Sequence, residues 1–368
     1  MRILVAGGAG FVGSHLCARL LEHGHDVVVV DNFLTGRWRN LEPMRRGPHR
    51  AHLEVQLQDV CEPVRVRPPV AAVLHLASPA SPVDYLRHPL ETLDAGAAGT
   101  RNLLALAHRD GARFLLASTS EVYGDPEVHP QPESYWGHVN PVGPRSVYDE
   151  AKRYAEAMAS AWARHAGVRV RIARIFNTYG PGMRLDDGRV IPSFASQALR
   201  GDPLTVHGDG SQTRSYCYVS DLVDGLLRLL WSDVEGPVNL GNPEELTVRE
   251  TAERIRDAVG SASPIQFHPL PEDDPRLRRP DVTRATTLLG WHPQVPFAEG
   301  IARTAADIAG RLAAAPQPHA NGVHANGATN GRTAHPVPRE LSVNGVAPRG
   351  PRPSIHGRPS VEAGGRLE

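Results

Sequence analysis

Apolar residues recur in short continuous runs over the first half of the chain, and patterns of helical period separate these runs. The runs RILVAG, DVVVVDN, AAVLHLAS, ARFLLAST and VRVRIARIFN predict strands that are apolar on both faces. Helices are predicted over SHLCARLLEHG, which ends at Gly24, and near 90–108 and 147–165. Such strands, alternating with helices, indicate an α/β fold with a Rossmann-type, doubly wound parallel sheet.

The pattern loosens after residue 177, where short strands and helices with many Gly and Pro predict a smaller mixed α/β lobe. We expect the doubly wound domain over 1–177, with a returning segment near 215–241, and the lobe mainly over 178–310. Residues 312–368 carry the imperfect repeat HANGVHANGATNG and no Phe, Tyr or Trp. Such a segment buries too little apolar surface to offset its ordering entropy, so it predicts a low-complexity, disordered tail.

Composition and charge narrow the classes of partner. The 40 acidic and 40 basic residues give a formal net charge of zero, so a nucleic-acid partner is not expected. There is no apolar run of about 18 residues, and the start MRILVAGG predicts a strand and turn rather than a signal peptide. Cys17, Cys61 and Cys217 are far apart and odd in number, which predicts neither disulfides nor a metal site. A reducing cytoplasm is the expected compartment.

The glycine-rich turn GGAGFVG lies directly after the first predicted strand and opens the first predicted helix. Gly8, Gly10 and Gly13 fit the spacing G-x-G-x-x-G, and Gly7, Gly10 and Gly13 fit the wider G-x-x-G-x-x-G. Glycines at these positions let backbone N–H groups approach a pyrophosphate, which then faces the helix N-terminus. The motif alone is weak, but its place in a strand–turn–helix unit predicts a dinucleotide site.

Acidic residues at the ends of later strands indicate which dinucleotide the site binds. Asp31 ends the second predicted strand, 18 residues after Gly13. Its carboxylate can accept hydrogen bonds from adenosine ribose hydroxyls and would repel a 2′-phosphate, so NAD is predicted rather than NADP. The alternative is a solvated acid at a strand end. Asp59 and Val60 follow a third apolar stretch and are predicted to meet the adenine.

Tyr148 and Lys152 stand four residues apart in a predicted helix and therefore share one face. Lys152 is the only lysine of the chain, whose other 39 basic residues are arginine. A nearby ammonium and an oxidised nicotinamide both favour the phenolate of a tyrosine, which could then act as a general base. A lysine also offers a compact ammonium to a ribose, where arginine is a bulkier planar fork. Chance placement of one solvated lysine is the alternative.

The turn GGAGFVG, Asp31 and the Tyr148–Lys152 pair together resemble the extended short-chain dehydrogenase/reductases that act on nucleotide sugars, over about residues 1–305. The segments ASTSEVYGDPEVHPQ, HLASPASP, RIFNTYGPGM and GSQTRSYCYVSDLV are most similar to the UDP-glucuronate decarboxylases, or UDP-xylose synthases, of that family. The resemblance implies NAD-dependent conversion of UDP-glucuronate to UDP-xylose. C4 is oxidised, carbon dioxide leaves the UDP-4-keto intermediate, and C4 is reduced again.

The resemblance also implies roles for individual residues. Thr119 would hydrogen-bond the sugar hydroxyl that Tyr148 deprotonates, and Glu121 would place the ring or a water near C5. Arg278 would meet the carboxylate, with Arg279 as the adjacent competitor. Ser120 stands where the 4,6-dehydratases carry an aspartate, which disfavours elimination of water. Surface ion pairing is the alternative for Glu121 and Arg278.

Further binding residues follow from the same family pattern. For the cofactor it implies Gly7, Gly10, Phe11, Val12, Gly13, Asp31, Asn32, Phe33, Thr35, Gly36, Asp59, Val60, Leu76, Tyr148 and Lys152. For the UDP-sugar it implies Pro79, Ser81, Asn177, Arg189, Gln212, Arg214 and Arg278. Arginine suits a diphosphate because its fork binds two oxygens, although each could be an ordinary surface arginine.

Three positions depart from the family pattern. Asp94 replaces a lysine found near the substrate in animal relatives, Gly96 replaces a supporting asparagine, and His207 replaces an aromatic residue near the uridine. One hypothesis is a looser enzyme that releases some UDP-4-keto-xylose. Two other functions stay open, a UDP-glucuronate 4-epimerase and a non-catalytic NAD-binding regulator. Relatives imply a homodimer that pairs the helices near 92–108 and 148–165.

Overall fold

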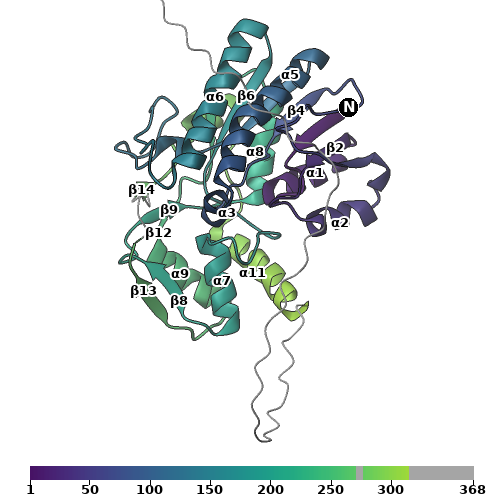
Figure 1. Ribbon diagram of the computed structural model, residues 1–368. Helices are drawn as coiled ribbons and strands as arrows, with labels where there is room; N and C mark the ends of the chain where they lie inside the picture. The colour runs from purple at the N-terminus through teal and green to yellow at the C-terminus, as the bar shows by residue number, and fades with distance from the viewer. Residues whose placement is uncertain (271–276, 315–368) are drawn as a thin grey trace, which may run out of the picture. The chain divides into compact units, whose positions relative to one another are not determined.

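The computed structural model describes residues 1–270 and 277–314, in which a seven-stranded sheet forms the centre (Figure 1). All six neighbouring strand pairs are parallel. The strands lie across the sheet in the order β11 (Pro237–Leu240), β6 (Arg169–Ile175), β5 (Arg113–Thr119), β4 (Ala72–His75), β1 (Arg2–Ala6), β2 (Asp26–Asp31) and β3 (Leu53–Leu57). The predicted doubly wound sheet is confirmed. From residue 315 on, the predicted tail lies outside the described residues.

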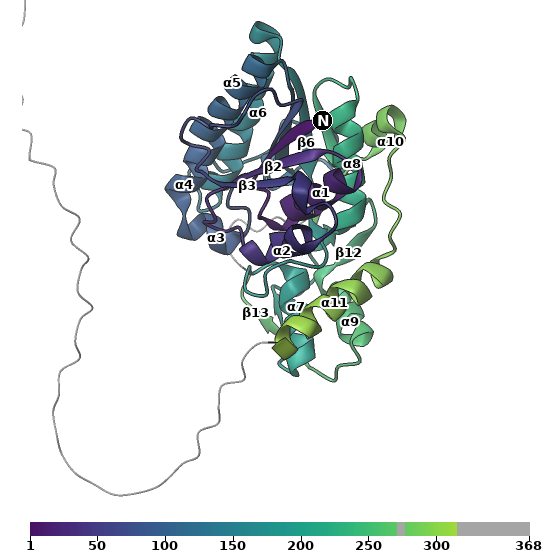
Figure 2. The same ribbon diagram turned by 90° about the vertical axis from the view of Figure 1, so that its right-hand side faces the viewer.

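Helices cover both faces of this sheet (Figures 1 and 2). One face carries α1 (Phe11–Glu22), α2 (Trp38–Arg46) and α8 (Val219–Trp231), and the other carries α4 (Pro89–Asp94), α5 (Thr100–Asp110) and α6 (Ser146–Ala166). Side chains of a strand alternate between faces. Accordingly, Ile3 and Val5 of β1 belong to the core under α1 and α8, whereas Leu4 belongs to the core under α5 and α6. Apolar residues on both faces therefore produced the continuous runs in the sequence.

The helix predicted near 90–108 is interrupted by one π-helical turn, Ala95–Gly99, between α4 and α5. A Cβ atom at Gly96 would lie 2.7 Å from the carbonyl oxygen of Ala151 and 2.8 Å from its Cβ. The absence of a side chain at Gly96 thus lets the turn pack directly against α6. This close approach gives a packing reason for glycine at a position where the family pattern has asparagine.

The remaining strands form three small sheets. They are β10 (Cys217–Tyr218) with β7 (Thr178–Tyr179), the trio β12 (Glu245–Thr247), β9 (Thr213–Ser215) and β14 (Leu277–Arg278), and β13 (Ile265–His268) with β8 (Leu204–His207). The other helices are α3 (Pro82–Arg87), α7 (Val190–Arg200), α9 (Val248–Ala258), α10 (Thr283–Leu289) and α11 (Phe297–Ala314), with 3₁₀ turns at Arg50–His52 and Ser120–Tyr123. The segment predicted to return near 215–241 supplies α8 and β11. The division at residues 177 and 178 stays a prediction.

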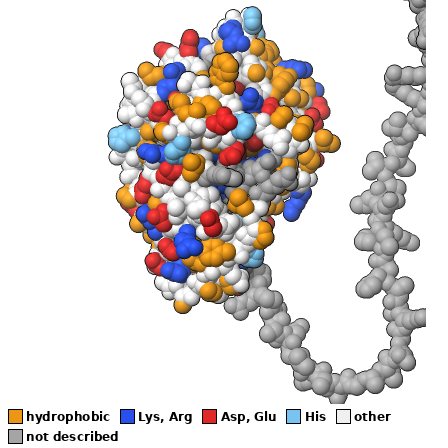
Figure 3. Space-filling view, turned by 90° about the vertical axis from the view of Figure 1, so that its left-hand side faces the viewer, with side chains coloured by type: hydrophobic (Ala, Val, Ile, Leu, Met, Phe, Trp, Pro, Cys, Tyr) orange, Lys and Arg blue, Asp and Glu red, His pale blue; other side chains and the backbone are white. Residues whose placement is uncertain are grey.

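Charged side chains of both signs are interspersed on the face shown in Figure 3, with apolar side chains among them. This mixture is in keeping with the zero net charge of the whole chain. Among the described helices, none combines the length and apolar character needed to cross a bilayer.

Candidate active site

A cavity of about 530 Å³ opens at the carboxyl ends of the central strands. Its walls include Gly7 after β1, Leu76 after β4, Ser120 after β5 and Asn177 after β6. A smaller cavity of about 160 Å³ shares Gly7 and Gly10 of the glycine-rich turn with the larger one. Ligands of open α/β sheets bind at this edge, and the larger volume suits a small molecule.

Most of the predicted site residues lie on the two cavities. The larger cavity is lined by Gly7, Gly10, Phe11, Val12, Gly13, Thr35, Leu76, Ser81, Thr119, Ser120, Glu121, Tyr148, Lys152, Asn177, Arg189, His207, Gln212 and Arg214. The smaller one is lined by Asp31, Asn32, Gly36, Asp59, Val60 and Pro79. Of the predicted site residues, all of which are described, Phe33 and Arg278 line neither of these two cavities. Phe33 stacks on Trp38 with ring centroids 4.4 Å apart.

The glycine-rich turn has the geometry that a pyrophosphate site requires. Gly7 adopts a φ of 80°, and a Cβ atom at Gly13 would lie 2.2 Å from the Gly7 carbonyl oxygen. Gly10 caps α1 without a side-chain hydrogen bond, and Phe11 and Val12 of the first turn line the cavity. Orphan N–H groups at a helix N-terminus bind phosphate oxygens. These residues therefore fit a dinucleotide.

Acidic side chains gather around the smaller cavity. The Asp31 carboxylate accepts hydrogen bonds from the backbone N–H groups of Ala9 (2.9 Å) and Phe33 (2.8 Å). Burial raises the pKa of this carboxyl, and the two hydrogen bonds oppose that effect. Asp59 and Asp94 line the same cavity. The family pattern places a lysine near the substrate at position 94, but the structure places Asp94 beside the adenosine end predicted for the cofactor.

The ring of Tyr148 lies against a second aromatic ring and near an ammonium group. It stacks on the ring of Tyr85, 5.2 Å away and tilted by only 8°, and the Lys152 Nζ atom lies 5.7 Å from its centroid. The Thr119 hydroxyl hydrogen-bonds the phenol. Tyr85 comes from α3, and the sequence contained no spacing signal that could have identified it as the partner of Tyr148.

Burial raises the pKa of the Tyr148 phenol, and this is the largest influence on it. The hydrogen bond from Thr119 and the charge of Arg189 lower the pKa, whereas the charge of Glu121 raises it. The spacing in the sequence indicated a neighbouring ammonium but could not indicate the desolvation of the phenol. In the protein alone the neutral phenol is therefore the favoured form, and further positive charge is needed to ionise it.

Lys152 is buried, with 5% of its surface exposed, and its Nζ atom donates a hydrogen bond to the Ala117 carbonyl oxygen at 2.9 Å. Desolvation lowers the pKa of its ammonium to about 8, and the charge of Glu156 opposes this shift. Ala117 lies on β5, so the strand and the helix together fix the amine. A buried lysine with a pKa near the working pH is the kind of group found at functional sites.

Glu121 lies between two arginines. Its carboxylate contacts Arg145 at 2.8 Å and Arg278 at 2.5 Å, and Arg278 also donates to the Gly124 carbonyl oxygen at 2.7 Å. Burial raises the pKa of Glu121, but the two guanidinium groups together hold it well below its usual range. Arg145 was missed from the sequence, although its spacing of three residues before Tyr148 placed it on the same turn.

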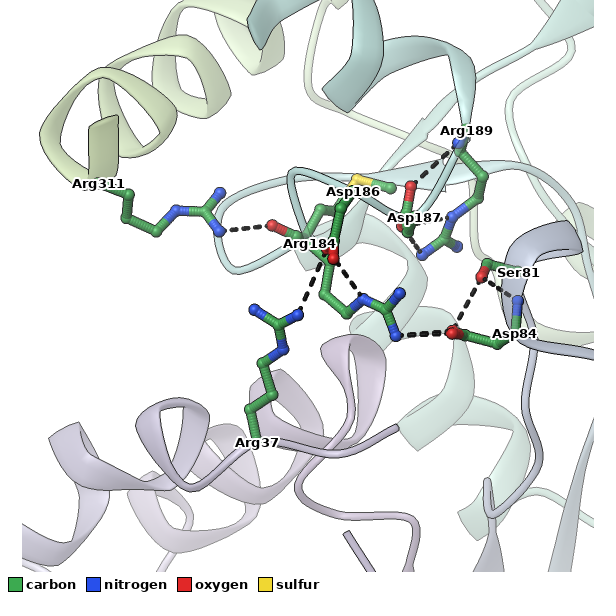
Figure 4. Close-up of polar contacts among 9 residues, drawn as sticks. Arg37, Ser81, Asp84, Arg184, Asp186, Asp187, Arg189 and Arg311 are labelled. Carbon is green, nitrogen blue, oxygen red and sulfur yellow. Dashed lines mark hydrogen bonds and ion pairs between the residues drawn. The ribbon is translucent and has the colours of Figure 1, made fainter. Parts of the chain in front are cut away.

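A polar cluster links the segment 181–189, which supplies part of the lining of the larger cavity, to α3 and to Arg37 (Figure 4). Arg184 contacts both oxygens of Asp84 on α3, at 2.8 and 2.9 Å. Arg37 and Arg184 both pair with Asp186, each at 3.3 Å. Arg189, predicted to hold the diphosphate, is paired with the buried Asp187 at 2.5 Å. The segment thus joins residues of the cofactor side to the predicted phosphate-binding arginine.

Asp149 is a buried carboxyl next to Tyr148, and its Oδ1 atom has no hydrogen bond within the described residues. Burial, then the charge of Glu121, raises its pKa to about 7, although Arg145 and Arg278 oppose the shift. A carboxyl with a raised pKa in the folded state stabilises the protein at low pH and loses that contribution as pH rises through the folded value.

We therefore expect Asp149→Asn to have a higher free energy of unfolding than the parent protein at pH 8, by on the order of 1 kcal/mol. The difference should shrink between about pH 7 and pH 4, because below the unfolded pKa both side chains are neutral. Chemical denaturation at several pH values measures this. Asp224→Asn, at an exposed pair with Arg228 on α8, is the control, and identical pH dependence in both variants would refute the expectation.

Comparison with known proteins shows which family model and which curated proteins the chain is similar to. Residues 3–241 match the model of the NAD dependent epimerase/dehydratase family. UDP-glucuronic acid decarboxylase 1 of Danio rerio is 56% identical over 303 residues, which are 82% of this chain and 71% of that protein.

Two solved structures of similar fold are also sugar-nucleotide epimerases. UDP-glucose 4-epimerase of Thermotoga maritima with UDP-glucose has a TM-score of 0.77 at 29% identity, over 85% of this chain and all of that one. UDP-glucose 4-epimerase of Thermus thermophilus with NAD has a TM-score of 0.73 at 29% identity, over 84% and 99%. The match over most of the sheet, together with the geometry of the glycine-rich turn and the Tyr148–Lys152 pair, shows that this chain belongs to the NAD-dependent epimerase/dehydratase family of extended short-chain dehydrogenase/reductases.

Proposed function

We propose that this protein is a UDP-glucuronate decarboxylase, which converts UDP-glucuronate to UDP-xylose and carbon dioxide with NAD as a recycled cofactor. One observation carries the proposal: a single cavity combines Tyr148, Lys152 and Thr119 with a carboxylate, Glu121, that is flanked by two arginines. Similarity to the decarboxylase of Danio rerio over most of the chain supports the same substrate.

The first part of the reaction is oxidation at C4 of the sugar. Tyr148 takes the proton of the C4 hydroxyl as general base, and Thr119 hydrogen-bonds the same oxygen. Lys152 favours the phenolate by its charge and would contact the nicotinamide ribose. When bound, NAD supplies the hydride acceptor and a positive charge that further lowers the pKa of the phenol. Stacking on Tyr85 keeps the Tyr148 ring in place throughout.

The second part is loss of the carboxyl group. The ketone at C4 places the sugar carboxylate in a β-keto acid, so carbon dioxide leaves and its electron pair moves toward the C4 oxygen. Thr119 and Tyr148 hydrogen-bond that oxygen as its negative charge grows. Glu121 with Arg145 and Arg278 carries one negative and two positive charges, so the group favours an anionic substrate. C5 would then gain a proton from water near this group, and C4 would regain the hydride that it lost while Tyr148 returns the proton to the C4 oxygen.

Incubation of the purified protein with UDP-glucuronate, with and without added NAD, tests the proposal. We expect equal amounts of carbon dioxide and a UDP-pentose, identified by NMR. An epimerase would form UDP-galacturonate and release no gas, so absence of carbon dioxide would reject decarboxylation. A non-catalytic regulator would form no product. Accumulation of UDP-4-keto-xylose would support the looser enzyme inferred from the departures at Asp94, Gly96 and His207.

We also propose a homodimer that pairs α4 and α5 with α6, as the family pattern implies. Apolar side chains are exposed on or beside these helices, namely Leu86, Leu90, Leu93 and Tyr154. Burial of such side chains in a partner would be favourable. Light scattering in solution measures the mass, and a monomer at all concentrations would contradict this assembly.

A cytoplasmic location is proposed from the three free cysteines.

A further inference from the structure

Two fully buried amide side chains, Gln131 and Asn239, hydrogen-bond residues close in sequence to Arg278 and Glu121 and have no part in the mechanism above. Each is 0% exposed. Gln131 lies in the segment between the 3₁₀ turn at Ser120–Tyr123 and α6, and Asn239 lies on β11, 108 residues later. Buried amides are costly unless their polar atoms are paired. The hydrogen-bond partners of Gln131 and Asn239 therefore identify the segments that these two side chains connect.

Gln131 binds the residues directly after Arg278. Its backbone N–H donates to the Arg279 carbonyl oxygen at 2.9 Å, and its own carbonyl oxygen accepts from the Asp281 N–H at 3.0 Å. Its side-chain Oε1 atom accepts from the Arg279 N–H at 2.8 Å. One residue thus makes three hydrogen bonds to the three-residue stretch 279–281, and the side chain fixes the residue next to Arg278.

Asn239 joins this stretch to the turn that carries Glu121. Its Nδ2 atom donates to the carbonyl oxygens of Gln131 at 2.9 Å and Asp281 at 3.0 Å. Its Oδ1 atom accepts from the hydroxyl of Tyr123 at 2.8 Å, and Tyr123 follows Glu121 by two residues. The amide network therefore connects the backbones on both sides of the Glu121–Arg278 ion pair.

The position of Arg278 depends on this anchoring. Its guanidinium contacts Glu121 at 2.5 Å and the Gly124 carbonyl oxygen at 2.7 Å, while its Nε atom is buried without a hydrogen bond among the described residues. Arg278 is 3% exposed, so its side chain has little room to adjust if the backbone moves. Hydrogen bonds of these lengths weaken steeply when the geometry changes.

We propose that Gln131 is a positioning residue that, together with Asn239, holds Arg278 against Glu121 and so sets the preference of the cavity for a sugar with a carboxylate. The proposal rests on the proposed function, which places the substrate carboxylate beside this pair. Gln131 touches no reacting atom and acts through Arg278.

The test compares Gln131→Met, which keeps the length of the side chain and removes only its side-chain hydrogen bonds, with the parent protein. Calorimetry measures the dissociation constants of UDP-glucuronate and of UDP-glucose, which lacks the carboxylate. We expect UDP-glucuronate to bind about tenfold more weakly and UDP-glucose to change by less than about twofold. In an Arg278→Met background, Gln131→Met should add no further loss.

Equal weakening of both nucleotide sugars, no change in either, or an undiminished effect in the Arg278→Met background would overturn the proposal. Thr304→Val, which removes a buried hydrogen bond on α11 away from the cavity, controls for simple loss of stability. Hydrogen exchange of the parent protein decides the case even if Gln131→Met does not fold. The Arg279 and Asp281 amides should exchange as slowly as the central sheet, and rapid exchange would reject the anchoring. Carbon dioxide release by the parent protein tests the proposed function separately.

Discussion

Tyr148→Phe is expected to lower kcat for carbon dioxide release by about 10³-fold, within the range that loss of a general base produces. The substitution removes one oxygen atom and leaves the ring, which is 7% exposed and stacked on Tyr85. Binding of UDP-glucuronate should therefore change by less than about threefold, because the ring still fills its site. Initial rates and calorimetry measure the two quantities.

Tyr154→Phe is the matched control, because Tyr154 lies on the same helix but is 46% exposed. It should behave as the parent protein. A Tyr148→Phe variant that retains more than about a tenth of the parental rate would show that another group removes the proton. Loss of binding and rate in equal measure would instead indicate a structural role for the phenol.

Lys152→Arg is expected to lower kcat by about 10²-fold, although the positive charge is kept. The lysine amine fits a buried site where one hydrogen bond reaches Ala117. A guanidinium is wider and carries five N–H donors, so it cannot occupy the same place beside the Tyr148 ring without leaving donors unpaired. This result would explain why an arginine-rich chain has its single lysine here.

The pH profile of the same variant gives a second test. In the parent protein kcat should fall as pH rises above about 8, because the Lys152 ammonium has its pKa lowered to about 8 and loses its charge there. The arginine variant should lack this fall, since guanidinium stays protonated. Arg164→Lys, an exchange of the same two residue types at an exposed position of α6, serves as the control. A variant with parental rate and profile would contradict this account of Lys152.

Several features of the fold and site could be predicted from local sequence. The runs of apolar residues fixed the order of strands and helices, because strands buried on both faces need such runs. GGAGFVG and its place between a strand and a helix predicted the dinucleotide turn. The i, i+4 spacing predicted that Tyr148 and Lys152 share a face, and both line the cavity.

Other features depend on residues that are distant in sequence. Tyr85 stacks on Tyr148 from a helix 63 positions earlier, and Arg145 completes the environment of Glu121 beside Arg278. Asp94 lies on the smaller cavity, away from the place that the family pattern suggested. Glycine at position 96 is explained by its close approach to Ala151 of α6. No periodicity or spacing in the sequence predicts contacts of this kind.

The sequence by itself determined the type of sheet, the glycine-rich turn and the chemical identity of the proposed base and its cation, because these depend on neighbouring residues along the chain. Only the tertiary structure decided how strongly each group is charged. The pKa of Tyr148 is raised by burial and that of Lys152 is lowered by it, and Glu121 is ionised because two arginines converge on it. Desolvation and charge pairing depend on the distances between side chains, which arise only when the chain is folded.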